Sequence, residues 1–172
     1  GKIGSLSESR KNAYESIIPS IIAFGFDPEK THIYIDTDYP ELYTFAMHLG
    51  TRLTVDAVNT VFGDKSMITP GQVFYRSVVQ MAQILLPQLP EFGGAKPTLI
   101  PVGIDQHPYV LLARDVAKTL KLVPPSEMVF KFLPSLKDPN AKMSKSVSDS
   151  AIYFSDTSEV IQKKIYGAYT GA

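Results

Sequence analysis

The sequence predicts an α/β fold in which helices flank a short parallel sheet. Two apolar runs of strand length, 97–102 and 128–132, are separated by a helical pattern, as in a parallel strand-helix-strand unit. Gly103 and a polar cluster follow the first run, and we expect a ligand site at this carboxyl edge. The 172 residues are 44% hydrophobic and 20% charged, which is typical of one globular domain or a part of one.

Helical patterns surround these two runs. The segment Ser5-Leu6-Ser7-Glu8 predicts a helix start, because the serine hydroxyl and the glutamate can cap the first turn. Apolar residues at helical spacing then continue to Gly25, a C-terminal cap, and Pro19 should bend the helix or restart it. Further helices are expected over 40–49, 55–62, 70–86, 111–120 and 158–169.

Two more segments are predicted to be strands. Thr31–Ile35 is rich in β-branched and aromatic residues and ends at a polar turn, and Ile152–Phe154 is a short apolar run. Two or three parallel strands are too few for a stable open sheet with helices on both faces. The chain therefore resembles a part of a larger domain.

Composition excludes several classes of protein. The 17 basic and 17 acidic residues give a net charge of zero, so no overall field would attract nucleic acid. The absence of cysteine excludes a disulfide scaffold and a thiolate metal site. No apolar run approaches the ~18 residues of a membrane span. We expect a cytoplasmic protein that does not enter a membrane.

The segment Ala141-Lys142-Met143-Ser144-Lys145-Ser146 carries two ammonium groups, two hydroxyls and no apolar face. Such a loop suits the binding of a polyanion, since flexible lysines, hydroxyl donors and backbone N–H groups can all reach phosphate oxygens. If a triphosphate reacts at its α-phosphorus, each donor placed at the departing pyrophosphate stabilises the transition state by ~3–4 kcal/mol. A solvated Lys/Ser turn is the alternative reading of the composition.

Two motifs resemble a known family. Residues Lys142 to Ser146 reproduce the KMSKS signature of the class I aminoacyl-tRNA synthetases, and Gly103-Ile104-Asp105-Gln106 is similar to the family's GxDQ motif. The stretches 101–109 and 113–117 resemble the tryptophanyl branch, particularly its archaeal and eukaryotic form. The resemblance implies that 1–172 is the second half of a Rossmann-like catalytic domain.

A further signature of the family, HIGH, has no clear counterpart. Its nearest imitation is His48-Leu49-Gly50-Thr51, which differs at the fourth position and ends a predicted helix, where Gly50 is better explained as a cap. We therefore expect the first strand and its HIGH signature upstream of residue 1. The anticodon-binding domain is expected beyond Ala172.

The resemblance implies an ATP-dependent ligase that activates tryptophan to tryptophanyl-adenylate and transfers it to tRNA(Trp). Lys142 and Lys145 would steady the triphosphate and the pyrophosphate leaving group. Ser144 and Ser146 would donate hydroxyl hydrogen bonds and close the loop. Met143 would lie near the adenine, mainly through its backbone.

The remaining site residues would bind ribose and amino acid. Gly103 would let the ribose approach the backbone, and Asp105 would accept from a ribose hydroxyl or the substrate ammonium. Gln80 and Gln106 are the expected amino-acid ligands, since indole has one N–H donor and needs one well-placed acceptor. Gln83 is a rival of Gln80.

Structural roles compete with these assignments. Asp105 and Gln106 lie where a helix N-cap is expected, and such side chains are favoured there. His107 beside the turn is more often a structural residue than a ligand.

The resemblance also implies partners. Mg²⁺ is expected with ATP, although no acidic cluster requires it and no residue is assigned as a metal ligand. A homodimer with contacts in the region 39–89 is expected. A tyrosine–tRNA ligase and a non-catalytic nucleotide-binding module derived from a synthetase are the alternative functions. We expect the 172 residues alone to be inactive.

Overall fold

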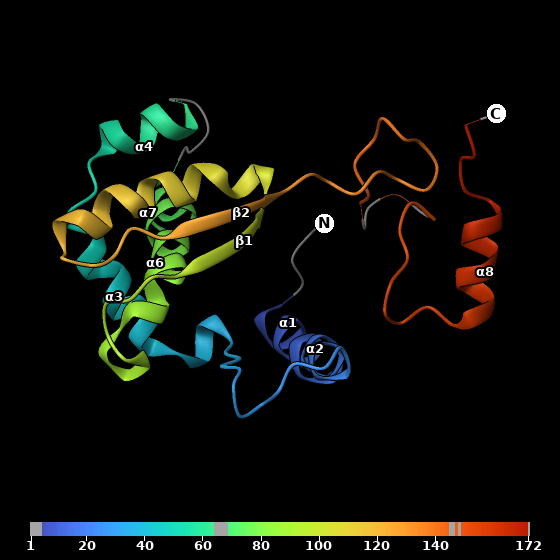
Figure 1. Cartoon of the computed structure of the whole chain (residues 1–172), viewed down its shortest axis with the longest axis horizontal. Coiled ribbons are helices and arrows are strands. Elements are labelled where there is room, and N and C mark those ends of the chain that lie inside the picture. Colours follow the sequence, from blue (N-terminus) through green and yellow to red (C-terminus); the bar gives the residue numbers. More distant parts are fainter. Residues whose placement is uncertain (1–4, 64–68, 145–146, 148, 172) are drawn as a thin grey trace. The chain divides into compact units, whose positions relative to one another are not determined.

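The computed structural model describes residues 5–63, 69–144, 147 and 149–171 (Figure 1). The chain divides into two compact units. One consists of residues 36–131, and the other combines residues 1–35 with residues 132–172. None of the described helices has the length and apolar character that a membrane span requires.

The unit 36–131 contains a parallel strand pair. Strand β1 (Leu99–Gly103) pairs in parallel with β2 (Ser126–Phe130), with Leu99 opposite Ser126 and Gly103 opposite Phe130. Helix α7 (His107–Thr119) connects the two strands (Figure 1). The predicted strand-helix-strand unit of an α/β fold is confirmed, with the second strand starting two residues earlier than the apolar run suggests.

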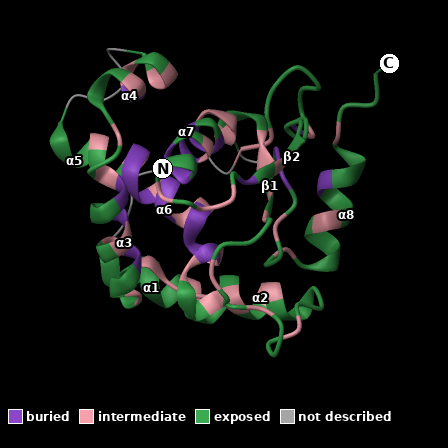
Figure 2. Ribbon diagram, turned by 60° about the vertical axis from the view of Figure 1, so that its left-hand side comes forward, coloured by how far each residue is buried: buried purple, intermediate pink, exposed green. Residues whose placement is uncertain are grey.

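Helices supply the core of this unit. They are α3 (Pro40–Gly50), α4 (Val55–Phe62), α5 (Pro70–Val73), α6 (Gln80–Leu85) and α7. The buried residues lie mainly on α3, α6 and α7 (Figure 2). Each large apolar side chain removed from water contributes about 1.5–3 kcal/mol. The largest of those that are fully buried are Leu42, Leu49, Val79, Met81, Leu85 and Val110.

The helix predicted over 70–86 is present, but a π-helical segment, Phe74–Val79, separates α5 from α6. Its start has the expected chemistry, because Thr69 and Gln72 form a capping box around Pro70. The wider π turn inserts one residue and rotates the helix face that follows. Three consecutive residues of this segment, Ser77 to Val79, are buried.

Gly50 is not the helix cap that the sequence suggests. It is the last residue of α3, and Thr51 occupies the cap position. A Cβ atom on Gly50 would lie 3.3 Å from Cγ1 of Val78. The absence of a side chain therefore lets the π-helical segment approach α3 closely.

The two strands are less buried than a continuous apolar run predicts. Leu99 on β1 and Met128, Val129 and Phe130 on β2 are all exposed. The reason is that the sheet has only two strands among the described residues, so most of its apolar surface has no neighbouring strand or layer.

The other unit begins with one helix in three parts: α1 (Leu6–Asn12), a π-helical segment (Ala13–Ile17) and α2 (Ile18–Ala23). The Ser5 hydroxyl accepts from the Glu8 N–H at 3.2 Å, so the predicted start is confirmed. Pro19 lies in the first turn of α2, directly after the π segment, where a proline needs no N–H partner, so the helix restarts there. Gly25, with φ of +93°, ends the helix as predicted.

Two predicted strands are wrong. Thr31–Ile35 and Ile152–Phe154 are not strands, and the residues between 31 and 35 have no regular secondary structure. A strand is defined by hydrogen bonding to a neighbour, and neither segment has such a neighbour among the described residues. The strand propensity of a segment does not by itself provide the neighbouring strand with which it must pair.

Helix α8 (Ser158–Tyr166) starts as predicted, because the Thr157 hydroxyl accepts from the N–H of Val160, and it ends before Gly167. A nearly buried ion pair holds it to the preceding loop. The Nζ of Lys164 lies 2.5 Å from Oδ2 of Asp156, and the two side chains are 7% and 11% exposed. The same Asp156 oxygen accepts from the N–H of Tyr153 at 2.8 Å, and the Lys164 ammonium lies 4.5 Å from the centre of the Tyr153 ring.

This ion pair predicts a loss of stability in acid. The hydrogen bond from Lys164, and then that from the Tyr153 N–H, lower the pKa of Asp156 below its ordinary value. A lowered folded-state pKa contributes stability that is present above the unfolded-state pKa and is lost as pH falls through the folded-state pKa. Thermal unfolding should therefore depend more steeply on pH below about 4 in the wild type than in Asp156→Asn.

A matched control for this measurement is Glu15→Gln, which removes an exposed carboxylate that lies 3.9 Å from Lys11 in the same unit. We expect the acid dependence of Glu15→Gln to follow the wild type. Equal acid slopes for Asp156→Asn and the wild type would contradict the role assigned to the pair.

Candidate functional site

The GxDQ segment forms one turn at the carboxyl end of β1. Gly103 ends the strand, a 3₁₀ turn covers Ile104–Gln106, and α7 begins at His107. Asp105 is exposed, and Gly103 and Gln106 are half-buried. The structure therefore brings these three predicted site residues together where ligands bind in parallel α/β sheets.

Helix capping does not explain Gln106. This residue occupies the N-cap position of α7, but its side chain makes no capping hydrogen bond. Pro108 in the first helical turn has no N–H that would need a cap. The Gln106 amide is therefore not used to start the helix.

The two glutamines that compete for the amino-acid role have different surroundings. Gln80 is half-buried at the start of α6, directly after the π-helical segment. The Gln83 amide instead donates to both carboxylate oxygens of Asp36, at 3.0 and 2.9 Å. Burial, followed by the charge of Asp36 and then Tyr75, raises the pKa of Tyr43 beside this pair. The nitrogen of the Gln83 amide is thus already committed to a carboxylate.

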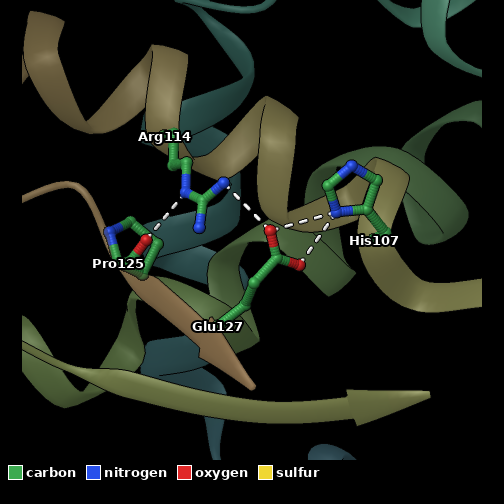
Figure 3. Close-up of polar contacts among 4 residues, drawn as sticks. All are labelled: His107, Arg114, Pro125 and Glu127. Carbon is green, nitrogen blue, oxygen red and sulfur yellow. Dashed lines mark hydrogen bonds and ion pairs between the residues drawn. The ribbon is translucent and has the colours of Figure 1, made fainter. Parts of the chain in front are cut away.

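A polar cluster ties the start of α7 to β2 (Figure 3). Nδ1 of His107 lies 2.9 and 3.0 Å from the two carboxylate oxygens of Glu127. Nη1 of Arg114 lies 2.9 Å from the same carboxylate, and its Nε donates to the Pro125 carbonyl at 2.8 Å. Because a carboxylate only accepts, Nδ1 of His107 carries the proton in this contact. We call His107, Arg114 and Glu127 the Glu127 cluster.

The lysine loop, residues 141–146, has an ordered base in the other unit. Lys142 pairs with Pro134 in an antiparallel bridge, the Met143 N–H donates to the Leu133 carbonyl at 2.9 Å, and the Ser135 N–H donates to the Ala141 carbonyl at 2.8 Å. These bonds fix the backbone at the start of the signature, from Ala141 to Met143.

The Lys142 side chain also contacts an aromatic ring. Its Nζ lies 4.0 Å from the centre of the Phe132 ring, a cation–π contact. This contact places the Lys142 ammonium over the ring. Lys145 and Ser146, the other predicted residues of the loop, lie outside the described residues.

Ser150 closes the far side of the loop. This fully buried residue donates from its hydroxyl to the Ser144 carbonyl at 2.7 Å and accepts from the Ser144 N–H at 3.3 Å. Its own carbonyl accepts from the Leu136 N–H at 2.9 Å. The backbone at Ser144 is thus held through both its N–H and its carbonyl.

A cavity of about 680 Å³ lies beside the loop within the same unit. This volume is in the range of small-molecule sites. Met143, the residue predicted to lie near adenine, is part of its wall. The full lining is Asn12, Ser16, Ile17, Ser20, Ile21, Met143, Ile152, Tyr153, Phe154 and Ser155.

The predicted residues fall into two groups. Lys142, Met143 and Ser144 belong to one unit, whereas Gln80 and the turn Gly103–Gln106 belong to the other. That the two groups face each other across a nucleotide stays a prediction. Among the described residues no cluster of histidine and acidic side chains could hold a metal ion, so the Mg²⁺ expectation rests on phosphate oxygens and water.

A parallel strand pair with a GxDQ turn, together with a KMSKS loop, is the combination that characterises class I aminoacyl-tRNA synthetases. The family model described as tRNA synthetases class I (W and Y) matches residues 4–172, and the chain belongs to this family.

Comparison with individual relatives indicates the tryptophan members of this family. The chain is 36% identical over 172 residues to the tryptophan–tRNA ligase of Methanocaldococcus jannaschii, covering 97% of this chain and 46% of the relative. It is 41% identical over 167 residues to that of Pyrobaculum calidifontis, covering 96% and 44%. The crystal structure of tryptophanyl-tRNA synthetase from Aeropyrum pernix superposes with a TM-score of 0.85 at 33% identity, covering 99% and 46%. The chain thus spans about half the length of the relatives it matches.

The sequence did not single out Glu127, Arg114 or Ser150. One feature of the sequence could have pointed to Glu127, because a carboxylate directly before the apolar run 128–130 needs a partner if it is buried. No comparable feature pointed to the Ser150 hydroxyl, since serines are common in such loops.

Proposed function

We propose that this chain carries the second half of the catalytic site of a tryptophan–tRNA ligase. The observation that supports this most strongly is the GxDQ turn at the carboxyl edge of a parallel strand, in a chain whose relatives are tryptophan–tRNA ligases. The substrates would be ATP, L-tryptophan and tRNA(Trp). A cytoplasmic location is part of the proposal and agrees with a sequence that has no cysteine.

The first proposed step forms tryptophanyl-adenylate. A carboxylate oxygen of tryptophan attacks the α-phosphorus of ATP, and the bond from that phosphorus to the bridging oxygen of the pyrophosphate breaks. Negative charge grows on the departing pyrophosphate. Lys142 and Lys145 stabilise this charge, and the hydroxyls of Ser144 and Ser146 donate to the same oxygens.

In the second step, a terminal ribose hydroxyl of the tRNA attacks the carbonyl carbon of the adenylate, and AMP leaves with the electrons of the broken C–O bond while a phosphate oxygen of AMP takes the hydroxyl proton. Throughout both steps Gly103 leaves room for the ribose of the nucleotide, and Asp105 accepts from a ribose hydroxyl or the tryptophan ammonium. Gln80 and Gln106 hold the amino acid. Met143 contributes backbone contacts to the adenine.

Mg²⁺ belongs to the proposal as the partner of ATP. It would be coordinated by phosphate oxygens and water, because the described residues offer no protein site for it. The chain's own cations, led by Lys142, would act on the same phosphates from the protein side.

A homodimer through the 39–89 region is also proposed. A mostly apolar cavity of about 710 Å³ lies between α3, α4 and α5, where Met47, Val55 and Phe74 are exposed. Exposed apolar surface of this kind is frequent where a second subunit docks. Sedimentation equilibrium of the complete protein that stayed monomeric at micromolar concentration would contradict the dimer.

The function is tested by ATP–pyrophosphate exchange in the complete protein, with each amino acid in turn. We expect exchange with tryptophan only. Exchange with tyrosine would identify the other substrate of this family, and no exchange with any amino acid would favour a non-catalytic nucleotide-binding module. The 172 residues alone should not charge tRNA.

A further inference from the structure

The Glu127 carboxylate is held in a costly position. It is only 9% exposed, on a strand whose neighbours Met128, Val129 and Phe130 are apolar. An ionised carboxylate is removed from water only at a large free-energy cost unless it is paired and hydrogen-bonded. His107 and Arg114 supply both the opposite charge and the hydrogen bonds. An apolar side chain at this position could serve the stability of the fold as well, so stability alone does not explain the carboxylate.

The geometry of the cluster relates this charge to the GxDQ turn. Glu127 lies on β2 opposite Ile100 of β1, and its partner His107 is the residue directly after Gln106. Arg114 is bound two helical turns further along α7 and is also fastened to the Pro125 carbonyl. The beginning of α7 is therefore fixed to β2 by side chains, in addition to the strand pairing that ends at Gly103.

This arrangement restrains the turn from both ends. The strand pairing fixes the backbone at Gly103, and the Glu127–His107 contact fixes the residue after Gln106. Between these anchors lie only Ile104, Asp105 and Gln106, of which the last two are assigned to substrates. Loss of one anchor would let these two side chains adopt orientations that do not bind, and ordering them again on binding lowers affinity.

We propose that Glu127 is a positioning residue, which acts through His107 to hold Asp105 and Gln106 in the orientation that binds nucleotide and amino acid. This inference rests on the function proposed above. Glu127 itself does not touch substrate. Its effect is to reduce the freedom of the turn before the substrates arrive, so that less free energy is lost when they bind.

A positioning role differs in its kinetics from a structural one. If Glu127 only stabilised the fold, its loss would lower the melting temperature and the fraction of active protein, so the apparent kcat would fall while KM stayed constant. If Glu127 positions the turn, KM rises for both substrates, because Gly103 adjoins the nucleotide ribose while Gln106 binds the amino acid. Comparing the change in KM with the change in kcat therefore separates the positioning role from the structural role.

The test is Glu127→Gln in the complete protein, assayed by ATP–pyrophosphate exchange. The amide keeps the shape but removes the negative charge, and it replaces one of the two oxygens that face Nδ1 of His107 by an NH₂ group, which cannot accept from it. We expect KM for tryptophan and for ATP to rise by about ten-fold, with kcat within about two-fold. The matched control is Asp115→Asn on the same helix, whose carboxylate is 78% exposed and forms only a 3.5 Å pair with Lys118; both KM values should stay at the wild-type level.

Variants of His107 test whether Glu127 acts on the turn through this histidine. His107→Phe keeps a ring but removes the donor, and it should raise KM as much as Glu127→Gln does. His107→Asn places an amide N–H near the position of Nδ1 and should restore most of the wild-type KM. In the double variant Glu127→Gln/His107→Phe, the effects should not add, since both remove the same contact.

Hydrogen–deuterium exchange separates failure of this inference from failure of the proposed function. If the wild type gives no tryptophan-dependent exchange reaction, the proposed function is wrong, and amide protection across 103–107 still measures the restraint. We expect faster deuterium uptake there in Glu127→Gln than in Asp115→Asn. Equal uptake, or unchanged KM values with a lowered melting temperature, would overturn the positioning role.

Discussion

Replacing Lys142 by alanine should slow adenylate formation by on the order of 10²-fold or more and change tryptophan binding little. The ammonium is expected to act on the charge that develops on pyrophosphate, which exists only in the transition state. Such an interaction affects kcat and not the binding of the amino acid. The same result is expected for Lys145→Ala.

The position of Lys142 supports this expectation. Its backbone is fixed by the bridge to Pro134, and the backbone two residues later is fixed by Ser150, so the lysine stem starts from a defined point. The ammonium itself rests on the Phe132 ring. A cation–π contact is worth about 0.5–1 kcal/mol at an exposed site, which is small compared with the stabilisation expected at a developing pyrophosphate charge.

The measurement is pyrophosphate exchange in the complete protein at saturating tryptophan, combined with a tryptophan titration. Lys163→Ala is a suitable control, because it removes an exposed lysine of α8 in the same unit. It should leave the exchange rate unchanged. An unchanged rate in Lys142→Ala would show that this lysine does not stabilise the leaving group.

The sequence predicted the helices well because their ends carry local chemistry. Ser5, Thr54, Thr69 and Thr157 all cap helices, and each accepts from an N–H three residues later, as such side chains do. Gly63, with φ of +81°, likewise caps the end of α4. These signals lie within a few residues of each other and need no tertiary contact.

The failures of prediction concern features that depend on distant residues. Strand character at Thr31–Ile35 was predicted from composition, but a strand exists only with a neighbour to pair with. The π-helical segment Phe74–Val79 interrupts the regular helical spacing of apolar residues that the sequence suggested. A glycine is needed at position 50 because the Val78 side chain from that segment leaves little room for a Cβ atom there. Neither can be recognised from spacing along the chain.

The candidate site divides in the same way. The lysine loop and the GxDQ turn were found by their motifs, which are short and continuous in sequence. The Glu127 cluster joins residues separated by up to 20 positions, and only the folded structure shows that the Glu127 carboxylate meets His107 and Arg114. Motifs therefore point to the residues proposed to meet substrates, whereas the residues proposed to hold them in place are recognised only in the structure.

Replacing Gln80 by alanine should raise KM for tryptophan by on the order of 10²-fold while leaving KM for ATP unchanged. An indole N–H that loses its acceptor inside an apolar slot leaves a buried donor unpaired, and this penalty applies only to the amino acid. Gln80 is suited to the role because it is half-buried and directly follows the π-helical turn, a feature that often marks functional sites.

Gln83→Ala is the matched comparison, since it removes the same side chain three residues later on α6. The Gln83 amide is bound through its nitrogen to Asp36, so its loss should disturb that carboxylate and Tyr43 beside it and affect both substrates weakly. A selective rise of the tryptophan KM in Gln83→Ala, with Gln80→Ala unchanged, would transfer the acceptor role to Gln83. In that case Asp36 would act as the group that orients the glutamine, because a carboxylate bound to its nitrogen leaves the carbonyl oxygen directed away as the acceptor.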